Sequence, residues 1–141
     1  MAESLKKLKE LFDLKDADLR TYSPLTLAYI GDGVYELVIR TILVKKANGP
    51  VNRLHKKASS LVKASAQSGM MEILEPLLTE EEKSVYRRGR NAHSATMAKH
   101  ATMADYRRAT GFEALMGYLY LKEDFSRILE LVHAGLEKEE I

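Results

Sequence analysis

Hydrophobic residues recur at helical spacing along most of the chain, and the longest such segment lies between Ser23 and Gly49. Ser23 and Pro24 are typical of a helix start, because the hydroxyl accepts a hydrogen bond from a free N–H and proline needs no donor there. Asn48, Gly49 and Pro50 are typical of a helix end. We therefore predict a helix of about 24 residues. Its buried side is predicted to hold Leu27, Ile30, Val34, Leu37 and Val38.

The remaining pattern also predicts helices, because no segment alternates between apolar and polar residues with period two. An amphipathic helix is expected over residues 3–13. After Pro50 we expect a helix of about 16 residues, with a break at Ser68 and Gly69. A short apolar segment then follows over residues 70–78.

The second half of the chain begins with Thr79 and Glu82 at the spacing of a capping box, which predicts a helix from Glu80. A weak helix or loop is expected over residues 94–104. The next predicted helix has a buried side formed by Tyr106, Phe112, Leu115, Met116 and Leu119, and Asp124 caps a last one. The predicted fold class is therefore all-α, a helical bundle.

The composition fits one globular domain over residues 1–141, with 45% hydrophobic and 30% charged residues. The chain has no cysteine, which excludes disulfides and thiolate metal sites. His93 and His100 have no carboxylate or third histidine at metal-binding spacing, so we do not expect a histidine metal site. We find no secretory signal and no uncharged run of membrane-spanning length, and we expect a cytoplasmic protein without a membrane partner.

The net charge of +2 conceals two basic blocks. Residues 37–71 contain seven lysines and arginines and no acid, and residues 83–108 contain seven more against one aspartate. Such blocks suit a polyanionic partner. They are also compatible with ordinary solvated helix surfaces. The candidate phosphate-binding residues are Arg87, Arg88, Arg90, Asn91, Lys56 and Lys57.

Asp32 lies between Gly31 and Gly33 in the middle of the long apolar helix. Each glycine costs about 1 kcal/mol in a helix relative to alanine, and a buried carboxylate needs a partner. One interpretation is close helix packing at the glycines, with a buried ion pair for Asp32. The other is a carboxylate left clear of bulky neighbours so that a hydrated metal or a phosphate can approach.

Two motifs resemble those of the ribonuclease III family. The segment Tyr29–Leu37, YIGDGVYEL, resembles the signature helix of the family, and Gly111–Leu121, GFEALMGYLYL, is similar to its second catalytic helix. The sequence contains no double-stranded-RNA-binding domain, so the resemblance is to the short bacterial form, Mini-ribonuclease III. It covers the chain from about residue 22 to residue 136.

The resemblance implies the ribonuclease III endonuclease fold and a metal-dependent phosphodiester hydrolase. Asp32 matches the signature aspartate and Glu113 the late catalytic glutamate, so both are expected to bind Mg²⁺, which one or two carboxylates and several waters can hold. Glu36 lies one turn from Asp32 and either orients groups around the metal or forms a salt bridge with Arg40.

The chain departs from the larger enzymes of the family at three positions. Ala28, Thr110 and Leu25 stand where those enzymes carry further acids. At most two of the four metal-site carboxylates of the family therefore remain. Such a site is compatible with one well-hydrated Mg²⁺ and does not support a second metal.

The resemblance also implies partners. The expected substrate is double-stranded RNA, specifically the precursor of large-subunit (23S) ribosomal RNA, cut by a homodimer whose interface contains Tyr29, Val34 and Leu37. Core packing is the alternative role of Tyr29. The sequence leaves open whether a ribosomal protein presents the substrate. Two other interpretations remain: a non-catalytic helical RNA-binding protein of the same fold, and an oligomerisation module.

Overall fold

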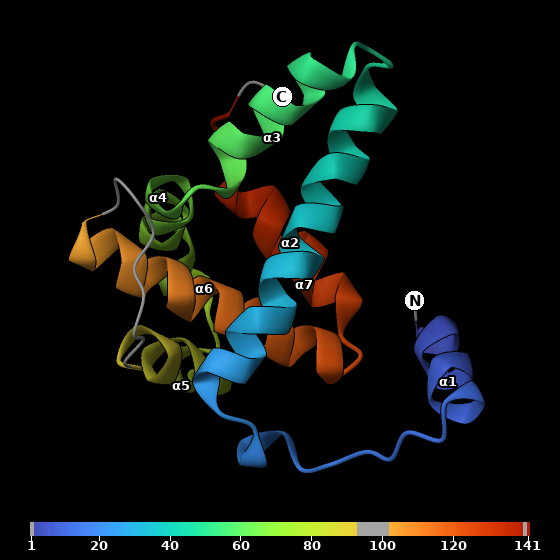
Figure 1. Cartoon of the computed structure of the whole chain (residues 1–141). Coiled ribbons are helices and arrows are strands. Elements are labelled where there is room, and N and C mark those ends of the chain that lie inside the picture. The colour runs from blue at the N-terminus through green and yellow to red at the C-terminus, as the bar shows by residue number, and fades with distance from the viewer. Residues whose placement is uncertain (1, 93–101, 140) are drawn as a thin grey trace.

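The computed structural model describes residues 2–92, 102–139 and 141, and every element in these residues is helical (Figure 1). The elements are α1 (Ala2–Leu11), η1 (Leu19–Thr21), α2 (Pro24–Lys46), α3 (Val51–Val62), α4 (Ala64–Leu74), η2 (Glu75–Leu77), α5 (Glu80–Arg90), α6 (Met103–Leu121) and α7 (Phe125–Gly135). The all-α prediction is confirmed. Residues 93–101, with both His93 and His100 and most of the segment predicted as a weak helix or loop, lie outside the described residues.

The long helix α2 begins and ends where the sequence predicts. The Ser23 hydroxyl accepts a hydrogen bond from the Thr26 backbone N–H at 3.1 Å, and Pro24 occupies the first turn. The expected core side is only partly correct, because Leu37 is 56% exposed. The helix turns that position away from the rest of the bundle, where Leu37 lies beside a surface hollow.

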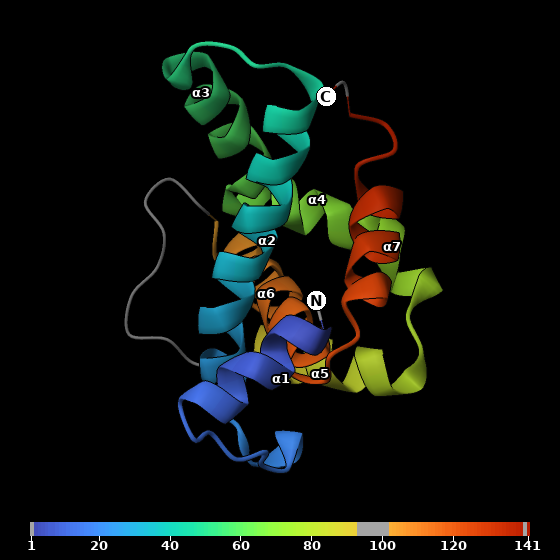
Figure 2. The ribbon, with the colours of Figure 1, turned by 90° about the vertical axis from the view of Figure 1, so that its right-hand side faces the viewer.

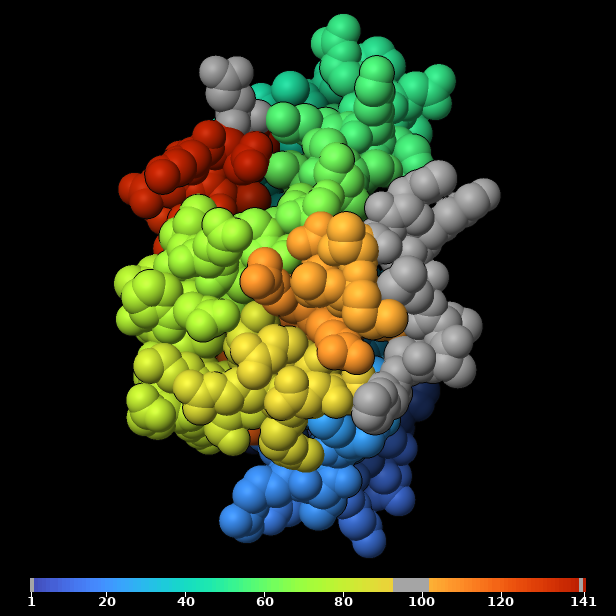
Figure 3. All heavy atoms as spheres, turned by 90° about the vertical axis from the view of Figure 1, so that its left-hand side faces the viewer, coloured from blue at the N-terminus to red at the C-terminus, as the bar shows by residue number. Residues whose placement is uncertain are grey.

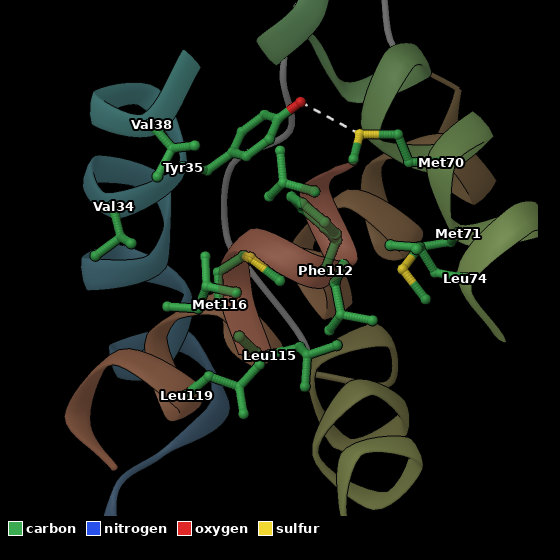
Figure 4. Close-up of a cluster of buried hydrophobic side chains, with 14 of the residues drawn as sticks. Val34, Tyr35, Val38, Met70, Met71, Leu74, Phe112, Leu115, Met116 and Leu119 are labelled. Atoms are coloured by element: carbon green, nitrogen blue, oxygen red, sulfur yellow. Dashed lines mark hydrogen bonds between the residues drawn. The ribbon is translucent and has the colours of Figure 1, made fainter. Parts of the chain in front are cut away.

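Helix α6 forms the centre of the molecule and packs against α2, α4, α5 and α7. Four of its side chains are buried, each no more than 2% exposed: Phe112, Leu115, Met116 and Leu119 (Figure 4). Tyr35 of α2 contacts Phe112 edge-on, with ring centroids 4.9 Å apart. The Tyr35 hydroxyl donates a hydrogen bond to the Leu61 carbonyl at 2.9 Å, which satisfies the polar end of this ring.

The chain breaks between α3 and α4 at Lys63, whose ψ of 157° is extended. The predicted break at Ser68 and Gly69 is therefore wrong. Both residues lie inside α4, and Ser68 is buried. Nothing in the composition around Lys63 marks a helix end. The break occurs because α4 turns to pack against α6 while α3 stays on α2.

Helix α5 starts with the predicted capping box, in which the Thr79 hydroxyl and the Glu82 carboxylate each accept a backbone N–H of the other residue. Glu82 is 4% exposed and also forms an ion pair with Arg127 of α7 at 2.8 Å. The predicted cap of α7 is also present, since the Asp124 carboxylate accepts from the Arg127 backbone N–H. The ion pair therefore joins the start of α5 to the first turn of α7.

Helix α1 lies at one edge of this bundle, in front of α5 and α6 in Figure 2, and has no buried residue. Its Lys9 forms an ion pair at 3.6 Å with Glu123, which follows α6. An extended segment connects α1 to α2 (Figure 1). Leu11 and Phe12 are both more than two-thirds exposed. None of the helices in the described part of the chain combines the length and hydrophobicity needed to cross a membrane.

Candidate active site

The two motif helices cross with their backbones in contact. A Cβ at Gly31 of α2 would overlap the backbone carbonyl of Glu113, and a Cβ at Gly117 of α6 would overlap the carbonyl of Leu27. Gly33 has open space around its Cα. Gly31 therefore serves close helix packing, whereas Gly33 leaves the surface beside Asp32 clear. The packing interpretation is confirmed for Gly31, and the approach of a metal or a phosphate beside Gly33 stays a prediction.

This crossing brings Asp32 and Glu113 into contact, although 81 residues separate them in the sequence. Burial and the contact with the Asp32 carboxyl raise the pKa of Glu113 to about 8, while a side-chain contact with Gln67 acts in the opposite direction. Asp32 itself is exposed to solvent, and Glu113 is partly buried. The two carboxyl groups thus form a pair in which charge repulsion favours a proton on Glu113.

Asp32 forms no ion pair with any described residue, so the predicted structural role as half of a buried ion pair is not supported. Its charged neighbour is a second carboxyl group. Two acids held side by side are unfavourable for folding unless a proton or a cation lies with them. The arrangement fits a site that binds a cation better than it fits a structural contact.

The donor atoms of this pair suit a hard divalent cation. Both side chains supply carboxylate oxygens, which Mg²⁺ prefers to nitrogen or sulfur. No group of three or more histidine, cysteine, aspartate or glutamate side chains in the described residues is arranged to hold a metal ion. A two-carboxylate site leaves the other coordination positions to water, as Mg²⁺ tolerates.

The positions where the larger enzymes carry further acids contribute nothing to this site. Ala28 is buried, and the buried Thr110 hydroxyl donates a hydrogen bond to the Tyr106 carbonyl of its own helix at 3.0 Å. Leu25 is 38% exposed near the start of α2. None of these three positions adds a carboxylate to Asp32 and Glu113, and the set of metal ligands stays a prediction.

Glu36 forms the predicted salt bridge with Arg40, at 2.7 Å. Both side chains are substantially exposed, and such pairs contribute little to stability. The salt bridge is the alternative that the structure supports for this residue, and a role of Glu36 around a metal stays a prediction.

Sequence reasoning missed Gln67. It lies on α4, is 1% exposed, and its side chain contacts that of Glu113. A polar residue among small ones in a basic segment gave no sign of burial. Only the four-residue spacing to Met71, another buried residue of α4, suggests that Gln67 faces the core.

The predicted RNA-binding residues fall in two places. Arg87, Arg88 and Asn91 are exposed at the end of α5, while Arg90 is half-buried with its guanidinium 5.7 Å from the centre of the Tyr86 ring. The end of α5 lies beside the start of α6, which adds Arg107 and Arg108 (Figure 3). Lys56 and Lys57 lie separately, on α3.

The predicted interface residues surround a surface hollow of about 430 Å³. Tyr29 is 85% exposed, which excludes simple core packing, and Leu37 is 56% exposed, whereas Val34 is mostly covered. Tyr120 and Phe125 complete the apolar lining, and Asp32 also borders this hollow. The apolar surface and the carboxyl pair are therefore neighbours.

Comparisons with known proteins agree with this geometry. The Ribonuclease III domain model matches residues 25–124, which include both motif helices. A protein of Clostridium tetani named Mini-ribonuclease 3 is 50% identical over 82% of this chain and 77% of its own length. The Mini-ribonuclease 3 of Enterococcus faecalis is 45% identical, covering 86% of this chain and 93% of its own.

A solved structure shows the same fold. The crystal structure of protein FN1578 from Fusobacterium nucleatum aligns with a TM-score of 0.80 and 30% sequence identity, covering 88% of this chain and 95% of that one. Family model, relatives and fold agree, and the family model spans the helices that carry Asp32 and Glu113. The chain therefore belongs to the ribonuclease III family, within its Mini-ribonuclease 3 group.

Proposed function

We propose that this endoribonuclease cuts double-stranded RNA with a divalent cation, Mg²⁺, held by Asp32 and Glu113. The observation that supports the proposal is the contact between these two carboxyl groups, from helices that cross at glycines. A bound Mg²⁺ supplies charge stabilisation at the scissile phosphate and a water of lowered pKa. The chain supplies an oxygen-only binding site on two rigid helices.

The two carboxyl groups lie in different surroundings. Asp32 is exposed and approachable, because Gly33 leaves space next to it. Glu113 is largely surrounded by protein, and burial together with the contact with Asp32 raises its pKa to about 8, so it would have to release a proton near neutral pH in order to bind a cation. Binding of the cation is therefore coupled to proton release, and cleavage should increase with pH up to about 8.

The basic surfaces support a duplex as substrate. Arginines 87 and 88 at the end of α5 and lysines 56 and 57 on α3 present charges from separate helices, which suits phosphates spread along a helix rather than one isolated phosphate. Double-stranded RNA is recognised mainly through phosphates and 2′-hydroxyls in its wide minor groove.

The apolar surface around Tyr29 supports a homodimer. Tyr29 projects from α2 next to a hollow lined by Val34, Leu37 and Phe125, so each copy offers both a projecting ring and a pocket for one. Such self-complementary surfaces suit a two-fold interface. Because Asp32 borders the hollow, the dimer would place two carboxyl pairs near one duplex, one for each strand.

By similarity to Mini-ribonuclease III, the proposed cellular substrate is the precursor of 23S ribosomal RNA in the cytoplasm. Processing of the naked precursor and of the precursor with its bound ribosomal proteins would show whether a protein must present it. If the enzyme recognises the RNA alone, the naked precursor should be cut at the same sites as the protein-bound one.

The decisive experiment is cleavage of a long RNA duplex with and without Mg²⁺, by the wild type and by Asp32→Asn and Glu113→Gln. Each amide keeps the size of the side chain and removes its charge, so cleavage should fall to near background while duplex binding persists. The double variant should be little worse than either single one, since both residues serve one step. Folded variants that bind RNA and cut at the wild-type rate would refute the assignment. A wild type that binds but never cuts would favour the non-catalytic alternative.

A further inference from the structure

Gln67 is the most deeply buried polar side chain near the carboxyl pair. It lies in the first turn of α4, where its backbone N–H donates to the Lys63 carbonyl at 3.1 Å, and only 1% of the residue is exposed. Helix α4 packs on α6 around Phe112, the neighbour of Glu113 (Figure 4). A buried amide is unfavourable unless its polar atoms have partners, so each of them requires an account.

The nitrogen of this amide has a partner that fixes the orientation of the side chain. Nε2 donates a hydrogen bond to the Val62 carbonyl at 3.0 Å. A carbonyl only accepts, so this bond fixes which end of the amide is nitrogen. The second N–H of Nε2 is then available to the Glu113 carboxylate, with which the Gln67 side chain is in contact.

The oxygen of the amide, in contrast, has no donor among the described residues. Oε1 is one of two buried side-chain atoms found without a hydrogen-bond partner in this part of the chain. An apolar residue of similar shape would avoid the unsatisfied oxygen, but it would leave the Val62 carbonyl without its donor. The contact with Glu113 is the one interaction that such a residue would lose at the site.

We propose that Gln67 is a positioning residue of the cation site, and that its amide nitrogen holds the Glu113 carboxylate in the orientation in which it meets Asp32. The unsatisfied Oε1 then accepts a hydrogen bond from a water of the site. This inference rests on the proposed function, because it needs Glu113 to bind the cation. Partners that hold a ligating carboxylate generally change metal affinity or activity 10- to 100-fold when they are removed.

The test compares Gln67→Met with Met71→Leu. Methionine matches the length of glutamine but neither donates to Glu113 nor accepts from water, and Met71 is a buried apolar residue one turn further along the same helix. The melting temperature is measured in EDTA and across a Mg²⁺ titration, and RNA cleavage is measured over the same titration. Mg²⁺ binding to each protein without RNA is measured by calorimetry.

The expected result for Gln67→Met is a melting temperature in EDTA at or somewhat below that of the wild type, because the Val62 carbonyl loses its donor. The Mg²⁺ concentration at half-saturation should rise about tenfold or more in both the calorimetric and the cleavage titrations. RNA affinity should stay unchanged, and excess Mg²⁺ should restore most of kcat. Met71→Leu should leave the Mg²⁺ dependence as it is.

A Mg²⁺ half-saturation within twofold of the wild type in Gln67→Met would overturn the proposal, and so would a loss of stability in EDTA with unchanged Mg²⁺ dependence. If Gln67→Met does not fold, Gln67→Leu gives the same readouts under the same criteria. The proposed function is tested separately by Asp32→Asn and Glu113→Gln. Loss of cleavage in those variants with normal Mg²⁺ binding in Gln67→Met refutes the role of Gln67 alone.

Discussion

Replacing Asp32 with asparagine should stabilise the metal-free protein above neutral pH. In the folded chain the Glu113 carboxyl holds its proton to about pH 8, whereas its ordinary pKa is 4.5. Below about pH 4.5 both the folded and the unfolded chain carry the proton, and the group does not affect stability. Between the two values the folded state binds the extra proton, so the free energy of unfolding falls as pH rises and levels off above pH 8.

At high pH the raised pKa of Glu113 lowers the free energy of unfolding by about 5 kcal/mol, since each pKa unit corresponds to about 1.4 kcal/mol. Burial is its largest cause and persists in the variant, and the contacts with Asp32 supply the rest. Asp32→Asn should therefore recover about 1–2 kcal/mol at pH 8.5. For a chain of this size that is roughly a 3–8 °C rise in melting temperature.

The assay is thermal unfolding of wild type and Asp32→Asn in EDTA from pH 5 to pH 9, repeated at high Mg²⁺. The variant should match the wild type at pH 5 and exceed it increasingly toward pH 8.5. With Mg²⁺ the order should reverse, because only the wild type gains cation binding. Glu72→Gln, an exposed carboxylate of α4, is the control and should change neither curve. A variant that melts below the wild type in EDTA at every pH would refute the carboxyl pair and indicate a structural ion pair of Asp32.

Three further predictions concern separate features. Gly31→Ala should lower the free energy of unfolding by about 3 kcal/mol or more, because the added Cβ meets the Glu113 backbone. Gly33→Ala should be neutral or slightly stabilising, because nothing lies near its Cβ position. Equal losses in the two variants would contradict the crossing geometry. The double variant Arg87→Ala and Arg88→Ala should bind an RNA duplex with a weaker salt dependence, reduced by about one phosphate contact for each arginine. The measurement is the slope of log K against log salt concentration. An unchanged slope would place the end of α5 outside the RNA interface. Tyr29→Asp should convert the proposed dimer to a monomer in sedimentation experiments, because it puts an unpaired charge into the proposed contact; a wild type that is already monomeric at micromolar concentration would refute the dimer.

The elements with local signals were predictable from the sequence. Ser23, Thr79 and Asp124 cap their own helices, so a few neighbouring residues determine where α2, α5 and α7 begin. The pairing of Asp32 with Glu113 was also predictable, but only through two motifs read together, since neither helix carries information about its crossing partner.

The errors and omissions arise where tertiary packing decides. Lys63 ends α3 because α4 leaves for a different neighbour, and no glycine or proline marks that position. Gln67 resembles a surface residue in the sequence, yet the turn at Lys63 directs it into the core. Leu37 has the periodicity of a core residue, but α2 extends along the edge of the bundle and exposes that side.

The backbone contact at Gly31 and Gly117 has a consequence for how such a protein can change over generations. The separation of the two acids depends on main-chain atoms touching main-chain atoms, and not on the shapes of the side chains around them. Substitutions among the buried leucines, methionines and valines can therefore accumulate without moving the acids apart. Relatives that differ at half of their aligned positions, such as that of Clostridium tetani, are expected to keep two glycines and two acids in register while the surrounding core drifts.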